Sequence, residues 1–175
     1  MAAAAPRIHE RIGLLRLDGR TAEVAEARAA VLRLRLPPGQ RSFTADAAAN
    51  LPRADADPER TPFAVVRRGV PVGFGIIDRR VAPRIATGDP AGSVMLRAFY
   101  VAPEWQGQGI GRTACGALGP LVRAIAPDVG EVLVAVAESN RAALRAYRAG
   151  GFTPTDRRLL PPDAAPQLVL RRPVA

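Results

Sequence analysis

The feature that most constrains the fold is the stretch VMLRAFYVAPEWQGQGIG, residues 94–111. Its first half is apolar and rich in strand-forming residues, which predicts a strand over 94–101. Pro103 cannot continue a sheet ladder, so the strand has to end before it. Glycines then alternate with other residues, and the apolar spacing from Ile110 to Ile125 predicts a helix that Gly119-Pro120 kinks or splits. A strand, a glycine-rich turn and a helix in this order indicate an α/β domain.

The remaining elements are predicted from the same periodicities. Pro- and Gly-containing segments separate them, and no repeat or domain boundary is visible. We therefore expect one α/β domain with a mixed central sheet flanked by helices over residues 11–175, after a flexible N-terminal segment 1–10. Around the segment above we expect strands over 12–17, 63–66, 72–77, 132–136, 152–160 and 167–171, helices over 22–34, 44–51 and 141–149, a solvated loop over 53–60 and an exposed connection over 79–92.

The composition narrows the chemistry. All 25 basic residues are Arg, so P-loop and Schiff-base chemistry, which need Lys, are excluded. The single Cys, Cys115, excludes an intramolecular disulfide and a Cys-rich zinc site, and we expect no metal. The single His, His9, lies in the N-terminal segment, which argues against a catalytic triad. We expect Cys115 to be a small buried hydrophobe and His9 to be exposed and idle.

The net charge of +9 has two readings. The abundance of Arg with Ala, Gly and Pro is typical of a GC-rich genome. The positive net charge also favours a polyanionic partner, such as nucleic acid, an anionic membrane or a phosphorylated small molecule. No aromatic-interleaved basic patch supports nucleic-acid binding. No signal peptide or apolar run of about 20 residues is visible, so we expect a cytoplasmic protein that does not bind membranes.

The glycine-rich turn is a candidate anion site. Glycines let backbone N–H groups approach a ligand at the start of a helix, and Arg112 and Thr113 add a charge and a hydroxyl there. This predicts a cradle for a pyrophosphate. A dinucleotide-binding fingerprint fits less well, because the spacing is Gln-x-x-Gly-x-Gly and Glu131 opens a strand. A tight turn without a ligand remains the alternative.

A second motif follows the next predicted strand: Asn140-x-x-Ala143-x-x-x-Tyr147-x-x-x-Gly151-Phe152. Together with Gln106-x-x-Gly109-x-Gly111, it resembles the GNAT superfamily of acetyl-CoA-dependent N-acetyltransferases. The two motifs span residues 94–152. The resemblance implies a largely antiparallel mixed sheet that is splayed at the acetyl-CoA site.

The resemblance also implies the reaction and its residues. A primary amine attacks acetyl-CoA directly, and no metal takes part. The Val101 N–H polarises the thioester carbonyl, and Tyr147 donates a proton to the departing thiolate. The residues implied to bind acetyl-CoA are Phe99, Tyr100, Val101, Gln106, Gly107, Gln108, Gly109, Ile110, Gly111, Arg112, Thr113, Asn140, Ala143 and Tyr147.

Several of these roles have alternatives. Tyr147 could be a packed tyrosine whose hydroxyl is satisfied elsewhere, and Asn140 could cap the following helix. The strand over 94–101 has no acid to serve as a general base, so Glu138 is the first candidate, with Glu104 and Asp46 behind it. Each of these acids could equally be a solvated surface group.

The sequence alone does not determine the acceptor substrate or the oligomeric state. The segment from Gln40 to Leu51, followed by Pro71-Val72-Gly73-Phe74, is similar to the bacterial diamine and spermidine acetyltransferase branch. We therefore expect a small amine or a polyamine-like acceptor. A non-catalytic acyl-CoA-binding or regulatory domain is the alternative. Exposed sheet edges near the C-terminal strands make a homodimer possible.

Overall fold

Seven strands form one sheet in the computed structural model, which describes residues 11–83 and 85–175. The segment 1–10 with His9, predicted to be flexible, lies outside the described residues. The spatial order is β1-β2-β3-β4-β5-β7-β6, and only β4 and β5 pair in parallel. The predicted mixed, largely antiparallel sheet is thus confirmed. The strands are β1 Ile12–Arg16, β2 Arg60–Arg67, β3 Val70–Asp78, β4 Ser93–Val101, β5 Glu131–Ala137, β6 Thr153–Leu159 and β7 Gln167–Pro173.

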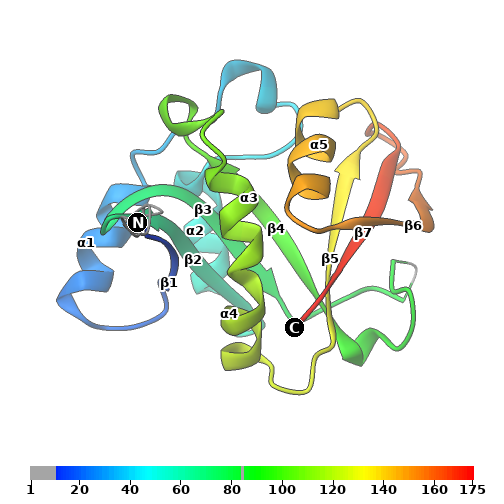
Figure 1. Cartoon of the computed structure of the whole chain (residues 1–175), viewed down its shortest axis with the longest axis horizontal. Coiled ribbons are helices and arrows are strands. Elements are labelled where there is room, and N and C mark those ends of the chain that lie inside the picture. The colour runs from blue at the N-terminus through cyan, green and yellow to red at the C-terminus, as the bar shows by residue number, and fades with distance from the viewer. Residues whose placement is uncertain (1–10, 84) are drawn as a thin grey trace, which may run out of the picture.

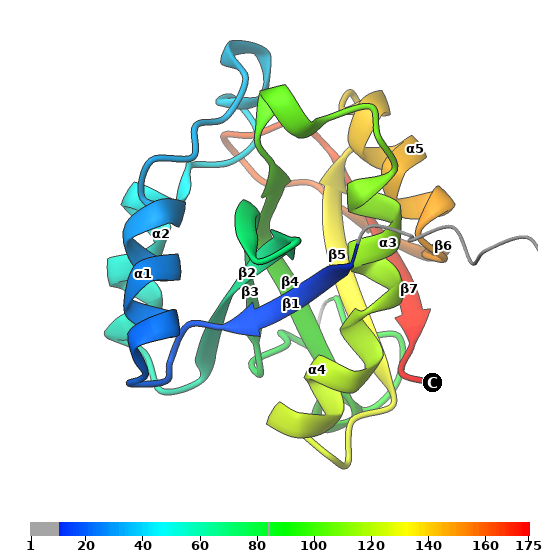
Figure 2. The same cartoon turned by 60° about the vertical axis from the view of Figure 1, so that its left-hand side comes forward.

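Helices cover both faces of this sheet (Figure 2). One face carries α1 Ala22–Val31 and α2 Ala47–Asp55, and the other carries α3 Ile110–Gly116, α4 Leu118–Ile125 and α5 Arg141–Ala149. Within the part of the chain that the structure describes, none of the helices has the length and hydropathy to cross a membrane. Short 3₁₀ turns η1 Pro38–Gln40, η2 Pro90–Gly92 and η3 Pro103–Trp105 join the larger elements.

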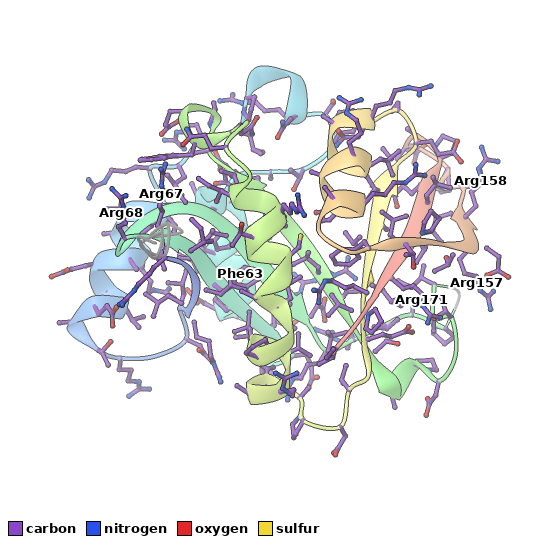
Figure 3. All side chains as sticks on the ribbon, in the orientation of Figure 1. Phe63, Arg67, Arg68, Arg157, Arg158 and Arg171 are labelled. Atoms are coloured by element: carbon purple, nitrogen blue, oxygen red, sulfur yellow. The ribbon has the colours of Figure 1, made fainter. Side chains whose placement is uncertain are left out.

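A separate core fills each side. Phe63 lies at the centre of the α3/α4/α5 side, packed with Leu96 and Leu118 (Figure 3). Phe74 and Leu51 are buried on the α1/α2 side. Apolar alternation along the strands therefore supplies both cores.

The connection over 79–92 differs from its prediction. Instead of being exposed, Val81, Ile85 and Ala86 are buried in a third cluster with Met95 and Leu133. Proline and glycine content pointed to a surface loop, but these apolar side chains cover the otherwise open face of β4 and β5.

Two helices have bounds that differ from the predicted ones, because tertiary packing determines where they begin and end. The second helix extends to Asp55 through Pro52, into the predicted loop over 53–60. Leu51 and Ala54 are buried on this helix, and their burial favours its continuation. The predicted long helix is split at Ala117, which places Pro120 in the first turn of α4, where its missing N–H breaks no intrahelical bond.

The functional consequence of the topology is a gap inside the sheet. β4 pairs with β5 only over Ser93–Met95 against Glu131–Leu133. Beyond these residues the two strands separate, as Figure 1 shows toward the top of the view. On its other side β5 remains paired with β7 along its whole length. The predicted splay is therefore present, between two well-anchored strands.

Candidate active site

A β-bulge opens the gap between β4 and β5. Phe74 pairs with Tyr100 and Ile76 with Arg97, so Ala98 and Phe99 together oppose a single residue of β3. Ala98 has a φ of +51°, a left-handed conformation that a non-glycine residue rarely adopts. Such a bulge bends its strand and increases its twist. It accounts for the divergence of β4 from β5.

The gap leads into a cavity of about 840 Å³. Its walls are the two diverging strands, the glycine loop with α3, α5, and two loops at residues 40–44 and 164–167. Most of the residues predicted from the sequence line this one cavity: Phe99, Tyr100, Val101, Gln106, Gly107, Gly109, Ile110, Gly111, Arg112, Asn140, Ala143 and Tyr147.

Three of the predicted residues do not line it. The Gln108 side chain accepts a hydrogen bond from Arg67 at 2.7 Å, and the Thr113 hydroxyl donates to the Gly109 carbonyl at 3.1 Å. The Glu138 carboxylate pairs with Arg158, whose Nη2 lies 2.9 Å from Oε2.

That ion pair makes Glu138 a poor base. The hydrogen bond from the Arg158 guanidinium lowers the pKa of the Glu138 carboxyl, so the carboxylate holds a proton less readily than an ordinary glutamate. Arg158 itself lies on β6 at the outer side of the molecule (Figure 3). The structure therefore does not bring Glu138 to the cavity.

The backbone of Val101 faces the gap. The Ala102 N–H donates to the Val72 carbonyl of β3 at 2.9 Å. In an antiparallel ladder, successive residues turn their N–H and C=O groups to opposite sides. Val101 therefore directs its backbone groups away from β3, and its carbonyl indeed accepts from the Gln106 side chain at 2.7 Å. Its N–H points into the space between β4 and β5.

The glycine loop closes one end of the cavity. Gly107 and Gly109 have φ angles of +76° and +77°, which only glycine adopts without strain. The amides of Ile110 and Gly111 belong to the first turn of α3 and have no partner within that helix. Arg112 is exposed beside them and makes no ion pair with any described residue. This end of the cavity offers backbone donors and one free positive charge to an anion.

Tyr147 lies on α5 with its side chain buried. Its ring packs between Phe99, at 6.1 Å between ring centroids, and Phe152, at 5.3 Å. No hydrogen bond joins its hydroxyl to another described group. Burial raises its pKa well above that of a free tyrosine, so the phenol stays protonated over the whole neutral range.

Cys115 lines the same cavity and is not activated. Burial raises the pKa of its thiol to about 11, so the thiolate is scarce at neutral pH. The expectation of a small buried hydrophobe agrees with this placement. Among residues 11–83 and 85–175, no group of three His, Cys, Asp or Glu side chains is arranged to hold a metal ion.

Residues 28–152 match the family described as acetyltransferase (GNAT) family. The chain belongs to this family. The match covers most of the chain, including the bulged strand, the glycine loop and Tyr147. A comparison of the sequence with curated proteins finds no match.

Solved structures share the fold of this GNAT protein at low sequence identity. The aminoglycoside acetyltransferase AAC(6')-Ib in complex with coenzyme A is 20% identical, with a TM-score of 0.69 over 93% of this chain and 95% of that chain. The same enzyme with ribostamycin and coenzyme A gives 19% and 0.68 over 92% and 93%. A GNAT-family acetyltransferase from Streptococcus pneumoniae is 14% identical, with a TM-score of 0.60 over 93% and 99%.

Asn140 caps α5 in this GNAT protein. Its Oδ1 accepts a hydrogen bond from the Ala143 N–H at 3.2 Å, which satisfies one of the unpaired amides of the first turn. The capping alternative is thus present, and Asn140 also lines the cavity.

Tyr100 points to the opposite face of the sheet. Its hydroxyl donates to the Leu34 carbonyl at 3.0 Å and accepts from the Ala47 N–H at 2.9 Å. Its side chain therefore ties β4 to both ends of the segment between α1 and α2. That segment includes the cavity-lining residues of the 40–44 loop. The backbone groups of Tyr100 turn toward β3, opposite to those of Val101, so its geometry adds nothing to its predicted role in binding acetyl-CoA.

Sequence reasoning missed one wall of the cavity. This wall contains Arg97 and residues of the 40–44 and 164–167 loops. The loops carry no recognisable chemical pattern. Arg97 did carry a signal, because it is the one charged residue in the strand SVMLRAFYV, which is otherwise almost entirely apolar. A charge at that place indicates a strand face that is not sealed in the core.

Proposed function

We propose that the protein transfers the acetyl group of acetyl-CoA to a primary amine of a small molecule by direct attack. The observation that carries this proposal is the convergence of the glycine loop, the inward-facing amide of Val101 and the side chain of Tyr147 on one cavity between β4 and β5. Relatives of the same fold that were solved with coenzyme A support the choice of acyl donor.

The residues present fit acetyl-CoA along the whole gap. The unpaired edge of β4 at Phe99 and Val101 can hydrogen-bond the pantetheine amides as an added strand would. The amides of the glycine loop and the free guanidinium of Arg112 fit the pyrophosphate. Ala143 offers a small apolar surface on α5 at the same cavity.

In the proposed reaction the acceptor nitrogen forms a bond to the acetyl carbon as the carbon–sulfur bond breaks. The Val101 N–H donates to the thioester oxygen, where negative charge develops. The Tyr147 hydroxyl gives its proton to the leaving sulfur and regains one from water. The amine releases one proton to solvent, so the products are the acetamide and free CoA thiol.

The cavity supplies no base for that last proton. Among its described lining residues there is no His, Asp or Glu. Glu138 is held by Arg158, Asp46 pairs with Arg35 at 3.2 Å, and Glu104 is exposed outside the lining. We therefore propose that the acceptor binds with its amine already neutral, or loses the proton directly to water.

A test separates catalysis from the non-catalytic alternative. Acetyl-CoA binding is measured by calorimetry, and CoA thiol release is followed over a panel of amines, with the acetylated product identified by mass. Binding with amine-dependent thiol release supports the proposal. Binding without release to any amine favours an acyl-CoA-binding or regulatory domain, and absence of binding rejects both. The polyamine-like acceptor, the homodimer and the cytoplasmic location remain predictions from the sequence.

A further inference from the structure

The part of the cavity wall that carries Arg97 has an unusual charge for an amine site. It is formed by residues of the 40–44 and 164–167 loops with Arg97, Ala135 and Ala137, and we call it the acceptor half. The lining of this half contains no carboxylate among the described residues, and its one charged side chain is Arg97. A polycationic amine entering here would meet a positive charge and no compensating negative one.

Acids near the acceptor half are turned away from it or already paired. Asp46 follows the 40–44 loop, occupies the N-cap position of α2 without a side-chain capping hydrogen bond, and pairs with Arg35. Asp163 precedes Ala164 on the other loop and is exposed to solvent, outside the lining. None of these carboxylates converts the site into one suited to a polycation.

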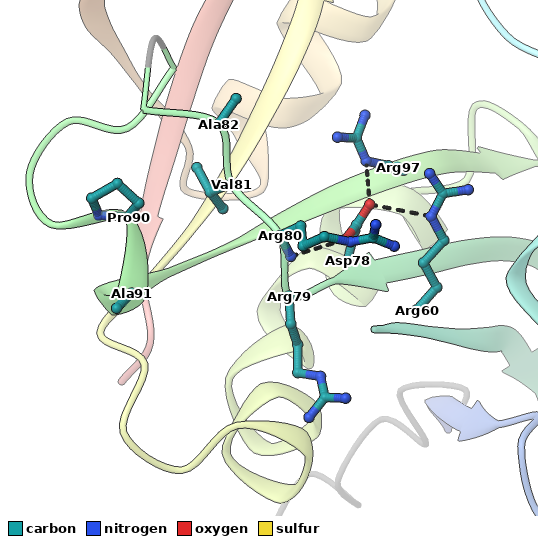
Figure 4. Close-up of a pocket in the computed structure, with 9 residues that line it drawn as sticks. All are labelled: Arg60, Asp78, Arg79, Arg80, Val81, Ala82, Pro90, Ala91 and Arg97. Atoms are coloured by element: carbon teal, nitrogen blue, oxygen red, sulfur yellow. Dashed lines mark hydrogen bonds and ion pairs between the residues drawn. The ribbon is translucent and has the colours of Figure 1, made fainter. Parts of the chain in front are cut away.

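The guanidinium of Arg97 is hydrogen-bonded to the buried carboxylate of Asp78. Its Nε donates to Asp78 at 2.9 Å, and Asp78 is only 2% exposed. Arg60 Nε, at 3.2 Å, and the Arg80 N–H, at 2.9 Å, bond the same carboxylate. Figure 4 shows Arg97 and Arg60 converging on Asp78 from neighbouring strands. Asp78 is therefore shared and cannot by itself neutralise Arg97.

The terminal nitrogens of Arg97 are unoccupied. Its only bond to a described residue uses Nε, and 41% of its side chain is exposed. Arg97 lies between the acceptor half and a neighbouring hollow of about 590 Å³, which is also lined by Arg60, Arg79 and Arg80. The surrounding cluster keeps a positive surplus, because these four arginines face only three acids: Asp57, Glu59 and Asp78.

We propose that the acceptor is an amine that also carries a carboxylate, which Arg97 binds through its two terminal nitrogens. The proposal rests on the acetyl transfer proposed above and names the class of its substrate. A guanidinium fixed at Nε presents a pre-oriented fork that matches a carboxylate. The rest of the acceptor half is neutral, with Ser42 and Thr44 as hydroxyls and Phe43, 40% exposed, as an apolar surface.

The first test changes the ligand rather than the protein. Acetyl transfer is measured for free amino acids and ω-amino acids, for their uncharged amides, and for putrescine and kanamycin as polycations. We expect kcat/KM to be about 10-fold or more higher for a carboxylate-bearing amine than for its amide, the size of one charge-assisted hydrogen-bonded pair. Equal values for acid and amide, or a preference for the polycations, overturn the assignment while leaving acetyl transfer intact.

The second test changes Arg97 and uses a neighbour as control. Arg97→Gln is expected to remove the preference for the acid over the amide, and Arg97→Lys to restore only part of it. Arg79→Gln removes a charge from the same cluster outside the acceptor half and should leave the preference unchanged. A preference that survives Arg97→Gln in a folded protein contradicts the proposal.

A binding measurement separates failure of this inference from failure of acetyl transfer. Calorimetry in the presence of CoA compares an N-acetyl amino acid with its N-acetyl amide on the wild-type protein and on Arg97→Gln. Tighter binding of the acid that Arg97→Gln abolishes supports the anionic acceptor even without turnover. Equal binding of the two compounds to the wild-type protein rejects it, whatever the enzyme acetylates.

Discussion

The ring of Phe99 on the bulged end of β4 lies 6.1 Å from the ring of Tyr147 on α5, centroid to centroid. This contact spans the gap in which β4 and β5 share no hydrogen bonds. Phe63 packs on the other side of Phe99 at 6.4 Å, and Phe152 packs on Tyr147 at 5.3 Å. Packing of aromatic rings, rather than hydrogen bonding, therefore fixes the position of the Tyr147 hydroxyl.

This arrangement makes Tyr147→Phe a clean test of proton donation. The substitution keeps the ring and its contacts and removes only the hydroxyl. We expect kcat to fall by about 10²-fold, the lower range for loss of a positioned acid, while the Kd of acetyl-CoA changes little. Steady-state kinetics and calorimetry measure the two quantities. An unchanged kcat would show that the hydroxyl takes no part in the chemical step.

The second tyrosine provides a contrasting prediction. Tyr100→Phe removes a hydroxyl that bonds Leu34 and Ala47 on the opposite face of the sheet. Because two buried backbone groups lose their partner, we expect the free energy of unfolding to fall by about 1–3 kcal/mol in a denaturant titration.

The kinetic effect of Tyr100→Phe should also differ from that of Tyr147→Phe. The lost bonds anchor both ends of the segment that carries the 40–44 loop, so we expect the KM of the acceptor to rise more than the KM of acetyl-CoA. A fall in kcat with both KM values unchanged would contradict this positional role.

Most of the binding residues predicted from the sequence line the cavity, because the elements that carry them are local. The glycine loop and the cap at Asn140 each follow directly after a strand, and their chemistry can be read within a dozen residues. Whether Glu138 lines the cavity could not be predicted from its neighbours in the sequence. Whether it reached the cavity depended on Arg158, which lies on a strand 20 residues later. Long-range pairing of this kind leaves no periodic signal.

The bulge at Ala98 also could not be predicted from the sequence. Its left-handed φ occurs at alanine, and no glycine marks the position. The gap between β4 and β5 was expected from the family resemblance, but its cause was not visible in the strand's apolar pattern. The acceptor half was missed for a related reason, since two unpatterned loops build it and only Arg97 stands out.

Two glycines of the loop allow a matched test of cofactor approach. Gly109 has a φ of +77°, whereas Gly111 lies in α3 with an ordinary φ, and an added Cβ meets no atom within 4 Å at either place. Gly109→Ala should cost about 1–2 kcal/mol of backbone strain and weaken acetyl-CoA binding. Gly111→Ala should leave stability unchanged or raise it.

The proposed cradle makes a further distinction between these variants. If the pyrophosphate rests on the first turn of α3, the Gly111→Ala methyl group crowds it and raises the Kd of acetyl-CoA without loss of stability. Thermal melts and calorimetry on both variants give the answer. An unchanged Kd in Gly111→Ala would move the phosphates away from this turn.

A different glycine holds α5 against α3. A Cβ added at Gly150 would lie 2.5 Å from the Cβ and 2.8 Å from the sulfur of Cys115, too close for either helix to remain in place. We expect Gly150→Ala to destabilise the fold by about 1–3 kcal/mol. Because α5 carries Tyr147, its displacement should also lower kcat. Gly116→Ala, in open space on α3, is the control and should be neutral or stabilising in the same melts.

The pH dependence follows from the missing base. No described His, Asp or Glu lines the cavity, so the acceptor must supply its own neutral amine. As pH rises toward the amine's pKa, the neutral fraction grows, and kcat/KM should rise about tenfold per pH unit and then level off. Burial raises the pKa of Tyr147, so the proton that it donates is retained and no falling limb is expected in the neutral and mildly alkaline range.

The decisive measurement compares two acceptors whose amines differ in pKa. If the amine itself titrates, the midpoint of the kcat/KM profile moves with the acceptor. If an enzyme base takes the proton, the midpoint stays at the same pH for both. A fixed midpoint would require a carboxylate such as Glu138 to leave Arg158 during the reaction. Glu138→Gln would then lower kcat/KM for both acceptors, whereas the arrangement observed here predicts no change.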